Sequence, residues 1–349
     1  MKQQAKELRE QGLSYDEISN QLGVPKTTIW NWINKVKSTF SPSSSTPSVG
    51  VHVVDQEIKQ QESSLHDLIM QLAPIQYVAP TKAKIRQTPT KAALVIGDTH
   101  FGSESQPVLD IFLQAVEEIR PESIILNGDT LDMFAISRYP KDVRYTVTLQ
   151  KERESYHRFL KQLHDITEPY GTTIYETNAN HSGDGLEGRW WRYLSDRIGE
   201  LACMPEIKEK LSYGNVFLPS EEWSRVKLVE FVEIVPGFVA MHGDVVRKHG
   251  GYSARGLLEK WFTSIIANHT HRIGMSSQRI PSIGTQQERI IRVYENGCAC
   301  DLKPLYASAA NWQNAFSICN YAEGGIAVET VVVEGTRAAV GMLGKSLKS

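Results

Sequence analysis

The sequence predicts an α/β protein in which a small helical domain precedes a larger α/β domain. Short apolar runs at 92–96 and 123–126 are typical of buried strands, and a helical pattern at 107–120 lies between them. Residues 38–48, STFSPSSSTPS, are too polar to build a core, and they separate the two parts. We therefore expect domains at 1–37 and 91–349, joined by a partly disordered linker over 38–90.

The composition is that of an ordinary globular chain, with 41% hydrophobic and 22% charged residues in a length of 349. The formal net charge of -2 gives no general attraction to nucleic acid, so any DNA contact must come from a local patch. Because no apolar run in the sequence could span a bilayer and the start is polar, we expect a cytoplasmic protein with no membrane partner. Four cysteines show no metal-binding or disulfide pattern and are expected to be reduced thiols: Cys203, Cys298, Cys300 and Cys319.

Residues 5–37 are expected to form three helices. The second, over 15–22, has Ser14 and Glu17 at the two positions of a capping box. The third, over 26–37, is entered through Gly23-Val24-Pro25, where Gly permits a tight turn and Pro suits a helix start. The residues expected to face inwards are Ile18, Leu22, Val24, Ile29, Trp32, Ile33 and Val36. The outward positions of the third helix include Lys26, Thr27, Thr28, Asn31 and Lys35.

This unit resembles the helix-turn-helix of resolvase-type and phage-packaging DNA-binding proteins. The resemblance implies that the third helix binds DNA, with Thr and Asn reading base edges and Lys meeting phosphate. Residues 1–37 hold six Lys and Arg against four acids, which is weakly basic, and a small protein-interaction domain is the alternative. Because a module of this size gains affinity by pairing, DNA and a second copy of the chain are the expected partners.

From residue 91 onward the pattern predicts a β-α-β unit. The first strand ends in Gly97-Asp98 and the second in Asn127-Gly128-Asp129. In open α/β sheets, ligands bind at the carboxyl ends of the strands, so both carboxylates lie where a site is expected. Further strands are expected at 172–177, 228–235, 238–241, 263–267, 290–294 and 326–333, of which the last completes the sheet.

Five short segments favour a metal centre. Each follows a predicted strand and supplies Asp, Asn or His, the donors suited to Mn, Fe, Zn or Ni. A single Asp-x-His pair would be weak evidence, and a lone His is more often a hydrogen-bonded core or surface residue. The five segments are Gly97-Asp98-Thr99-His100, Gly128-Asp129-Thr130-Leu131-Asp132, Asn178-Ala179-Asn180-His181, Met241-His242-Gly243-Asp244 and Asn268-His269-Thr270-His271-Arg272.

The order of these segments resembles the calcineurin-like metallophosphoesterases, over about 91–272. The resemblance implies a four-layer αββα sandwich and a phosphoesterase with two divalent metal ions. Mn²⁺ is the expected ion, with Fe, Zn, Ni and Mg as alternatives. Asp129 would bridge the two ions, because two close dications repel unless anionic oxygens lie between them. The other implied ligands are Asp98, His100 and His271 for one ion and Asn180, His242 and His269 for the other.

Three residues depart from the family pattern. Ala179 and Asn268 stand where Gly is usual, and Ser182 stands where an acid commonly follows the Asn-His pair. None is an implied ligand, but losing Gly can alter a turn. By the same resemblance His181 would act as general acid at the leaving group, with Asp132 raising its pKa. The alternatives are a further ligand or a bystander for His181, and a helix-capping carboxylate for Asp132.

Arg189 follows the third segment and is a candidate for binding substrate phosphate, although we favour a helix surface with aromatic core contacts. The same alternatives apply to Arg138, Lys141 and Arg144. Together, the two resemblances predict a hydrolase that cleaves DNA phosphodiesters, a nuclease brought to its substrate by residues 1–37. One alternative is a phosphatase or phosphodiesterase for a small molecule or a phosphoprotein, and another is a non-catalytic DNA-binding regulator or packaging factor.

Overall fold

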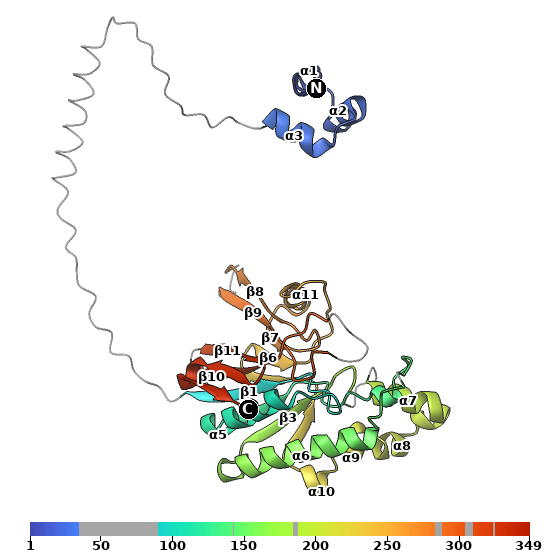
Figure 1. The fold of residues 1–349 in the computed structure, drawn as a ribbon, viewed down its shortest axis with the longest axis vertical. Coiled ribbons are helices and arrows are strands. Elements are labelled where there is room, and N and C mark those ends of the chain that lie inside the picture. Colours follow the sequence, from blue (N-terminus) through green and yellow to red (C-terminus); the bar gives the residue numbers. More distant parts are fainter. Residues whose placement is uncertain (35–89, 142, 184–187, 283–287, 304–309, 324) are drawn as a thin grey trace, which may run out of the picture. The chain divides into compact units, whose positions relative to one another are not determined.

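The structure is a computed structural model, and it describes residues 1–34, 90–141, 143–183, 188–282, 288–303, 310–323 and 325–349 (Figure 1). The chain divides into two units between Lys84 and Ile85. The predicted linker, apart from its last residue, lies outside the described residues, as does Lys35. Among the helices that are described, none combines the length and the apolar character needed to cross a bilayer.

The smaller unit has three helices around a small core. They are α1 (Lys2–Glu10), α2 (Tyr15–Leu22) and α3 (Lys26–Asn34). Both hydrogen bonds of the Ser14–Glu17 capping box are present, and Gly23 ends α2 with a left-handed φ of 64°. Ala5, Ile18 and Ile29 are fully buried where the helices meet. The helices and the cap agree with the sequence prediction, while DNA binding by α3 stays a prediction.

The larger unit holds two sheets. The first has the order β13-β12-β11-β10-β1-β2-β3-β4, and the second has the order β5-β6-β7-β9-β8. Strands β1 to β4 are parallel, as are β6, β7 and β9, and the other pairs are antiparallel. The strands of the first sheet are β1 (Lys91–Ile96), β2 (Ser123–Leu126), β3 (Thr173–Thr177), β4 (Val226–Val229), β10 (Ala315–Ala322), β11 (Gly325–Glu334), β12 (Arg337–Val340) and β13 (Lys345–Lys348). Those of the second are β5 (Val232–Val235), β6 (Phe238–Met241), β7 (Ser264–Ala267), β8 (Ile273–Ile280) and β9 (Arg289–Asn296).

Helices cover the outer face of each sheet (Figure 1). The long helices are α5 (Gln106–Ile119), α6 (Leu149–Thr167), α7 (Arg189–Ile198) and α11 (Tyr252–Trp261). Shorter ones are α8 (Pro205–Lys210), α9 (Tyr213–Phe217) and α10 (Ser220–Trp223). Single turns are η1 (Phe134–Ile136), η2 (Glu168–Tyr170), η3 (Gly199–Cys203) and η4 (Gly341–Leu343).

The core is arranged in four layers: helices, sheet, sheet and helix. In β1, Leu94 and Ile96 pack toward α5 and α6, while Ala93 and Val95 pack between the sheets. This alternation follows from the two-residue period of a strand that is buried on both faces. On the far side, α11 packs on the second sheet through residues such as Leu257. The layers agree with the sandwich implied by the sequence.

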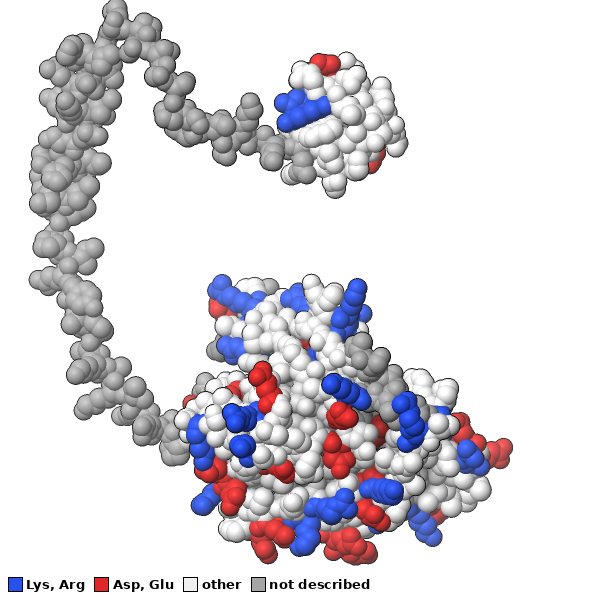
Figure 2. All heavy atoms as spheres, viewed as in Figure 1, with Lys and Arg blue, Asp and Glu red and all other residues white. Residues whose placement is uncertain are grey.

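One strand prediction is wrong. The apolar run 228–235 was expected to be a single strand, but it forms β4 in the first sheet and β5 in the second. Glu230 and Phe231 lie between the two strands, where the chain leaves one sheet for the other. On the face drawn in Figure 2, acidic and basic side chains of the larger unit are interspersed, which agrees with its near-neutral composition.

Candidate metal centre

The five predicted segments follow β1, β2, β3, β6 and β7 at their carboxyl ends. Because β1 to β3 are parallel in one sheet and β6 and β7 are parallel in the other, all five loops emerge at one edge of the sandwich. The backbone is unusual there, since Asp98, His100, Asp129, His269 and His271 all have φ between 45° and 73°. Such left-handed conformations are uncommon in residues other than Gly, and they concentrate at functional sites.

The first cluster consists of Asp98, His100 and His271, all buried. The Nε2 atoms of His100 and His271 are 3.2 Å apart, and Asp98 Oδ2 lies 3.6 Å from His271 Nε2. Two nitrogens bound to one ion at about 2.1 Å are themselves about 3–3.4 Å apart. Neither carboxylate oxygen of Asp98 has a hydrogen-bond partner, although burying such oxygens is costly. A cation would satisfy both.

The second cluster centres on His242. Its Nε2 lies 3.0 Å from Asn180 Oδ1 and 3.2 Å from His269 Nδ1. Its Nδ1 donates to the Asn127 carbonyl oxygen over 3.1 Å, which turns Nε2 toward Asn180 and His269. A backbone acceptor of this kind commonly orients a histidine that binds a metal.

Asp129 lies between the two clusters. Its Oδ2 is 3.8 Å from His100 Nε2 and 3.4 Å from His242 Nε2. Its Oδ1 accepts a hydrogen bond of 2.9 Å from the backbone N–H of His181. The structure thus brings together all seven residues that the sequence nominated as ligands, and the position of Asp129 is that expected of a bridge.

The electrostatics of the cluster suit cations. Burial raises the pKa of Asp98 to about 7. Burial lowers the pKa of His242, but Asp129 and Asp98 outweigh it and raise that pKa to about 9. In His100 burial is likewise outweighed, here chiefly by Asp132, and the pKa is about 9. Buried carboxylates therefore attract protons onto neighbouring imidazoles, and the oxygen and imidazole donors fit first-row divalent metals.

Asp132 contacts two histidines. Its Oδ1 lies 3.4 Å from His181 Nδ1, as expected, and also 3.3 Å from His100 Nδ1, which was not predicted. Burial lowers the pKa of His181 and outweighs the Asp129 and Asp132 carboxylates, which both raise this pKa, as was expected of Asp132. Asp132 thus connects the candidate metal ligand His100 to the candidate general acid His181.

Arg189 belongs to the site. Its Nη1 donates to the Asp132 carbonyl oxygen over 2.6 Å, and its Nη2 lies 2.6 Å from His181 Nε2. The aromatic core contacts come from its neighbour Trp190, which packs against Phe217 and donates to the Leu211 carbonyl oxygen. We favoured a helix surface for Arg189, but only 12% of its side chain is exposed.

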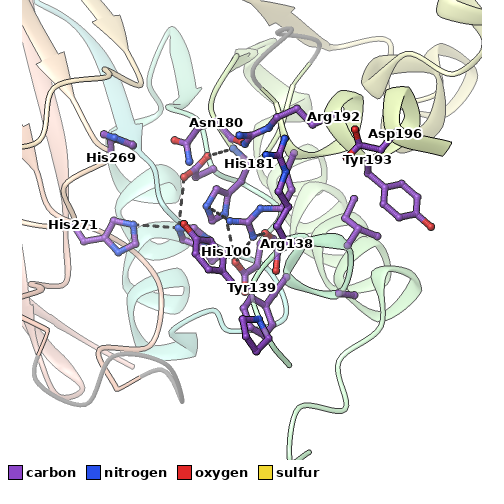
Figure 3. A pocket seen from close by; sticks show the side chains of 18 of the residues that line it. His100, Arg138, Tyr139, Asn180, His181, Arg192, Tyr193, Asp196, His269 and His271 are labelled. Carbon is purple, nitrogen blue, oxygen red and sulfur yellow. Dashed lines mark hydrogen bonds and ion pairs between the residues drawn. The ribbon is translucent and has the colours of Figure 1, made fainter. Parts of the chain in front are cut away.

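A cleft of about 1120 Å³ opens onto the centre. His269 and His271 lie on one side of it and Arg192 and Tyr193 on the other, with Arg138 near the centre of the view (Figure 3). His100 and His181 lie between these two sides. The sequence nominated Arg138 only as an alternative. It gave no signal for Arg192 or Tyr193, although a helix surface was favoured at Arg189.

The departures from the family pattern do not disturb the turns. Neither Ala179 nor Asn268 has a positive φ, so neither position requires Gly. Asn268 accepts a hydrogen bond from Asn127 Nδ2 and donates one to the Gly297 carbonyl oxygen, at 2.9 and 3.0 Å. Ser182 Oγ accepts one from the backbone N–H of Thr130. These side chains tie the loops together.

A pair of thiols adjoins the first cluster. Cys298 and Cys300 are buried beside His271, and Cys300 Sγ lies 3.6 Å from His271 Nδ1. Sequence reasoning found no metal-binding pattern in these cysteines. Their spacing carries no such signal, and only the path of the chain after β9 brings them to His271.

The predicted DNA-binding residues lie on α3. Lys26 and Thr27 are exposed and Thr28 is half-buried. Lys26 Nζ forms an ion pair with Asp16 Oδ2 at 2.5 Å. The side chain of Asn31 and the whole of Lys35 fall outside what the structure describes.

No family model matches the chain, and no curated protein matches it. Among solved structures, it is similar to Vacuolar Protein Sorting 29 from Cryptosporidium parvum, at 12% identity and a TM-score of 0.37, over 74% of this chain and 96% of that one. A Vps29 single mutant from Entamoeba histolytica matches at 14% identity and a TM-score of 0.32, over 70% of this chain and 99% of that one. Vps29 from Chaetomium thermophilum matches at 10% identity and a TM-score of 0.32, over 69% of this chain and 96% of that one. These similarities carry no argument about function.

Proposed function

We propose that the larger unit is a phosphoesterase that holds two divalent metal ions and hydrolyses DNA phosphodiesters. The observation that carries this proposal is the position of Asp129, whose Oδ2 faces a histidine of each cluster. A carboxylate oxygen shared in this way suits a pair of close cations, and paired cations are typical of phosphodiester hydrolysis. Asp98, His100 and His271 would hold one ion and Asn180, His242 and His269 the other.

The cations would neutralise charge at phosphorus and make a bound water nucleophilic at neutral pH. The residues beside them orient the substrate and move the proton. Arg189 would donate hydrogen bonds to a phosphate oxygen, a contact that suits the planar guanidinium group with its several N–H donors. This shift would free His181 Nε2, which Arg189 now contacts, to take up a proton from solvent and pass it to the leaving oxygen. Asp132 would hold the His181 ring through Nδ1.

DNA is favoured over a small ester because of residues 1–34. The α1 to α3 unit has the form expected of a helix-turn-helix, and a chain segment between the units would raise the local concentration of DNA at the metals. Pairing of two chains would strengthen the binding of the α1 to α3 units to DNA.

The test is hydrolysis by the purified full chain with Mn²⁺, using DNA and bis-p-nitrophenyl phosphate as substrates. Asp129→Asn and His242→Ala should abolish both activities. His181→Ala should keep its metal content and lose about 10²–10⁴-fold in rate. Rapid cleavage of the small ester with DNA untouched would favour a small-molecule enzyme. Bound metal with no turnover on any diester would favour a non-catalytic regulator.

A further inference from the structure

On the basis of the phosphoesterase function above, we propose that the cleft beside the metal centre binds a single strand of nucleic acid along one face of α7. The cleft measures about 1120 Å³. Pockets for small ligands measure roughly 300–1,000 Å³. The cleft is therefore slightly larger than such pockets and has room for more than a small phosphate ester.

The wall of the cleft is one face of a helix. In α7, the cleft-lining residues recur at the spacing of a single helical face: Arg189, Arg192, Tyr193, Asp196 and Arg197. In a surface helix a stripe with this spacing is usually apolar and faces the core. From Arg189 to Arg197 the helix rises about 12 Å. At the roughly 3.4 Å per nucleotide of a strand in a duplex, that length would span about three to four nucleotides, and it spans fewer of an extended single strand.

Three of the arginines that line the cleft have no carboxylate partner among the described residues, whereas Arg189 lies 3.6 Å from Asp132 Oδ1. Within the described residues, Arg138, Arg192 and Arg197 form no ion pair: Arg192 Nη2 donates to the Asn180 carbonyl oxygen at 3.3 Å, and the Arg197 guanidinium lies 5.0 Å from the centre of the Tyr193 ring. Several exposed basic residues elsewhere in this unit are paired, as in Lys91–Glu122, Lys161–Asp165, Arg255–Glu259, Arg279–Glu288 and Lys345–Glu118. Asp196 is the one acid on the α7 face. A row of phosphates would balance the arginines.

Aromatic rings favour a single strand over a duplex. Tyr139 is 68% exposed and lines the cleft together with Tyr193. Across the cleft, Trp312 lies against His271, with ring centres 4.2 Å apart. Unpaired bases stack on such rings whatever their identity, whereas the bases of a duplex stack on one another. Figure 3 shows Tyr193 on the side of the cleft away from His269 and His271, with Arg138 and Tyr139 near the centre of the view.

The first test measures binding of a fluorescent eight-nucleotide oligothymidylate to the full chain in EDTA, where no cleavage occurs. A single strand is used because a helix-turn-helix reads the grooves of a duplex. The double variant Arg138→Ala with Arg197→Ala should bind about 10-fold more weakly. The slope of log affinity against log salt should fall by about 1.4, since each phosphate contact on a single strand contributes about 0.7. Arg279→Ala, which removes a paired arginine on β8, should change neither quantity.

The second test concerns the aromatic contacts. Tyr139→Ala should weaken oligothymidylate binding by about 5-fold or more. Tyr252→Ala is the matched control, because Tyr252 is 60% exposed but lies outside the cleft. Circular dichroism and thermal unfolding of each variant show whether it is folded.

The outcomes separate the two proposals. Unchanged affinity and slope in the folded arginine variant would overturn the strand site, and cleavage of bis-p-nitrophenyl phosphate by the same protein would leave the phosphoesterase function standing. If the arginine variant lost strand binding, the strand site would be supported. If the native chain also cleaved no ester, the proposed phosphoesterase function would be overturned. Binding of duplex alone would overturn the choice of a single strand.

Discussion

At the scale of single residues, the Cys300 thiol lies against the candidate ligand His271, 3.6 Å from Nδ1. A contact on that nitrogen keeps Nε2 directed at Asp98 and His100. Cys300→Ala should therefore weaken Mn²⁺ affinity by about 10–100-fold, the usual effect of losing such an orienting partner. Titration calorimetry measures this, with Cys319→Ala as the control, since Cys319 is buried between the sheets far along β10 from the ligands. Equal affinities in the two variants would contradict the role of Cys300.

A second prediction at this scale concerns Arg189, whose guanidinium joins Asp132 and His181. Arg189→Ala should lower kcat/KM for a phosphodiester by about 10² or more, as expected for a donor at the reacting phosphate. Metal content, measured by atomic absorption, should stay unchanged because Arg189 is not a ligand candidate. Arg255→Ala removes an exposed arginine on α11 and should leave kcat/KM intact. Native kinetics in Arg189→Ala would mean that this arginine does not contact substrate.

At the scale of elements, the end of β3 is joined to its neighbours through the buried Glu176. Its carboxyl accepts hydrogen bonds from Thr130 on the β2 loop, Tyr156 on α6 and Tyr213 on α9. Tyr213→Phe should lower the free energy of unfolding by about 1–3 kcal/mol, because a buried acceptor loses a donor. Urea denaturation at one fixed Mn²⁺ concentration measures this. Tyr252→Phe at the exposed start of α11 should change it by less than about 0.5 kcal/mol, and equal effects would contradict the argument.

The sequence predicted those helices and strands whose apolar residues recur with the period of a helix or form a continuous buried run. The β2 and β6 bounds agree with the structure, as does the α5 helix within a residue. The strands β8 and β10 were missed for different reasons. In β8, residues 273–280 read IGMSSQRI, an edge strand that is half exposed and lacks an apolar run. In β10 the buried Ser317 interrupts the apolar pattern, and its hydroxyl is satisfied by Asn296 and Thr330, 21 and 13 residues away.

At the scale of the whole molecule, the ligand set was predictable because each ligand sits in a short motif after a strand. The partners of those ligands were not. Arg189 reaches His181 only because α7 packs against the β3 loop, and Cys300 reaches His271 only because the chain returns past β7 after β9. The thiol pair has no local pattern in the sequence, and the helical spacing of the α7 residues does not show that their face lines the cleft. Such pairings depend on tertiary packing, which local residue patterns do not encode.

The two units have separate cores, so metal should stabilise only one of them. The core of the smaller unit is Ala5, Ile18 and Ile29, and every candidate ligand lies in the larger unit. At 100 times its dissociation constant, Mn²⁺ adds about 2.7 kcal/mol to the stability of a unit that binds it only when folded. For a unit of this size that shift raises Tm by about 5–10 °C. Calorimetry with Mn²⁺ and with EDTA should show this rise in the main transition, while far-UV melting of α1–α3 is unchanged. Asp98→Asn should abolish the rise, because it removes a carboxylate whose buried oxygens have no other partner, and a persistent rise would place the metal elsewhere.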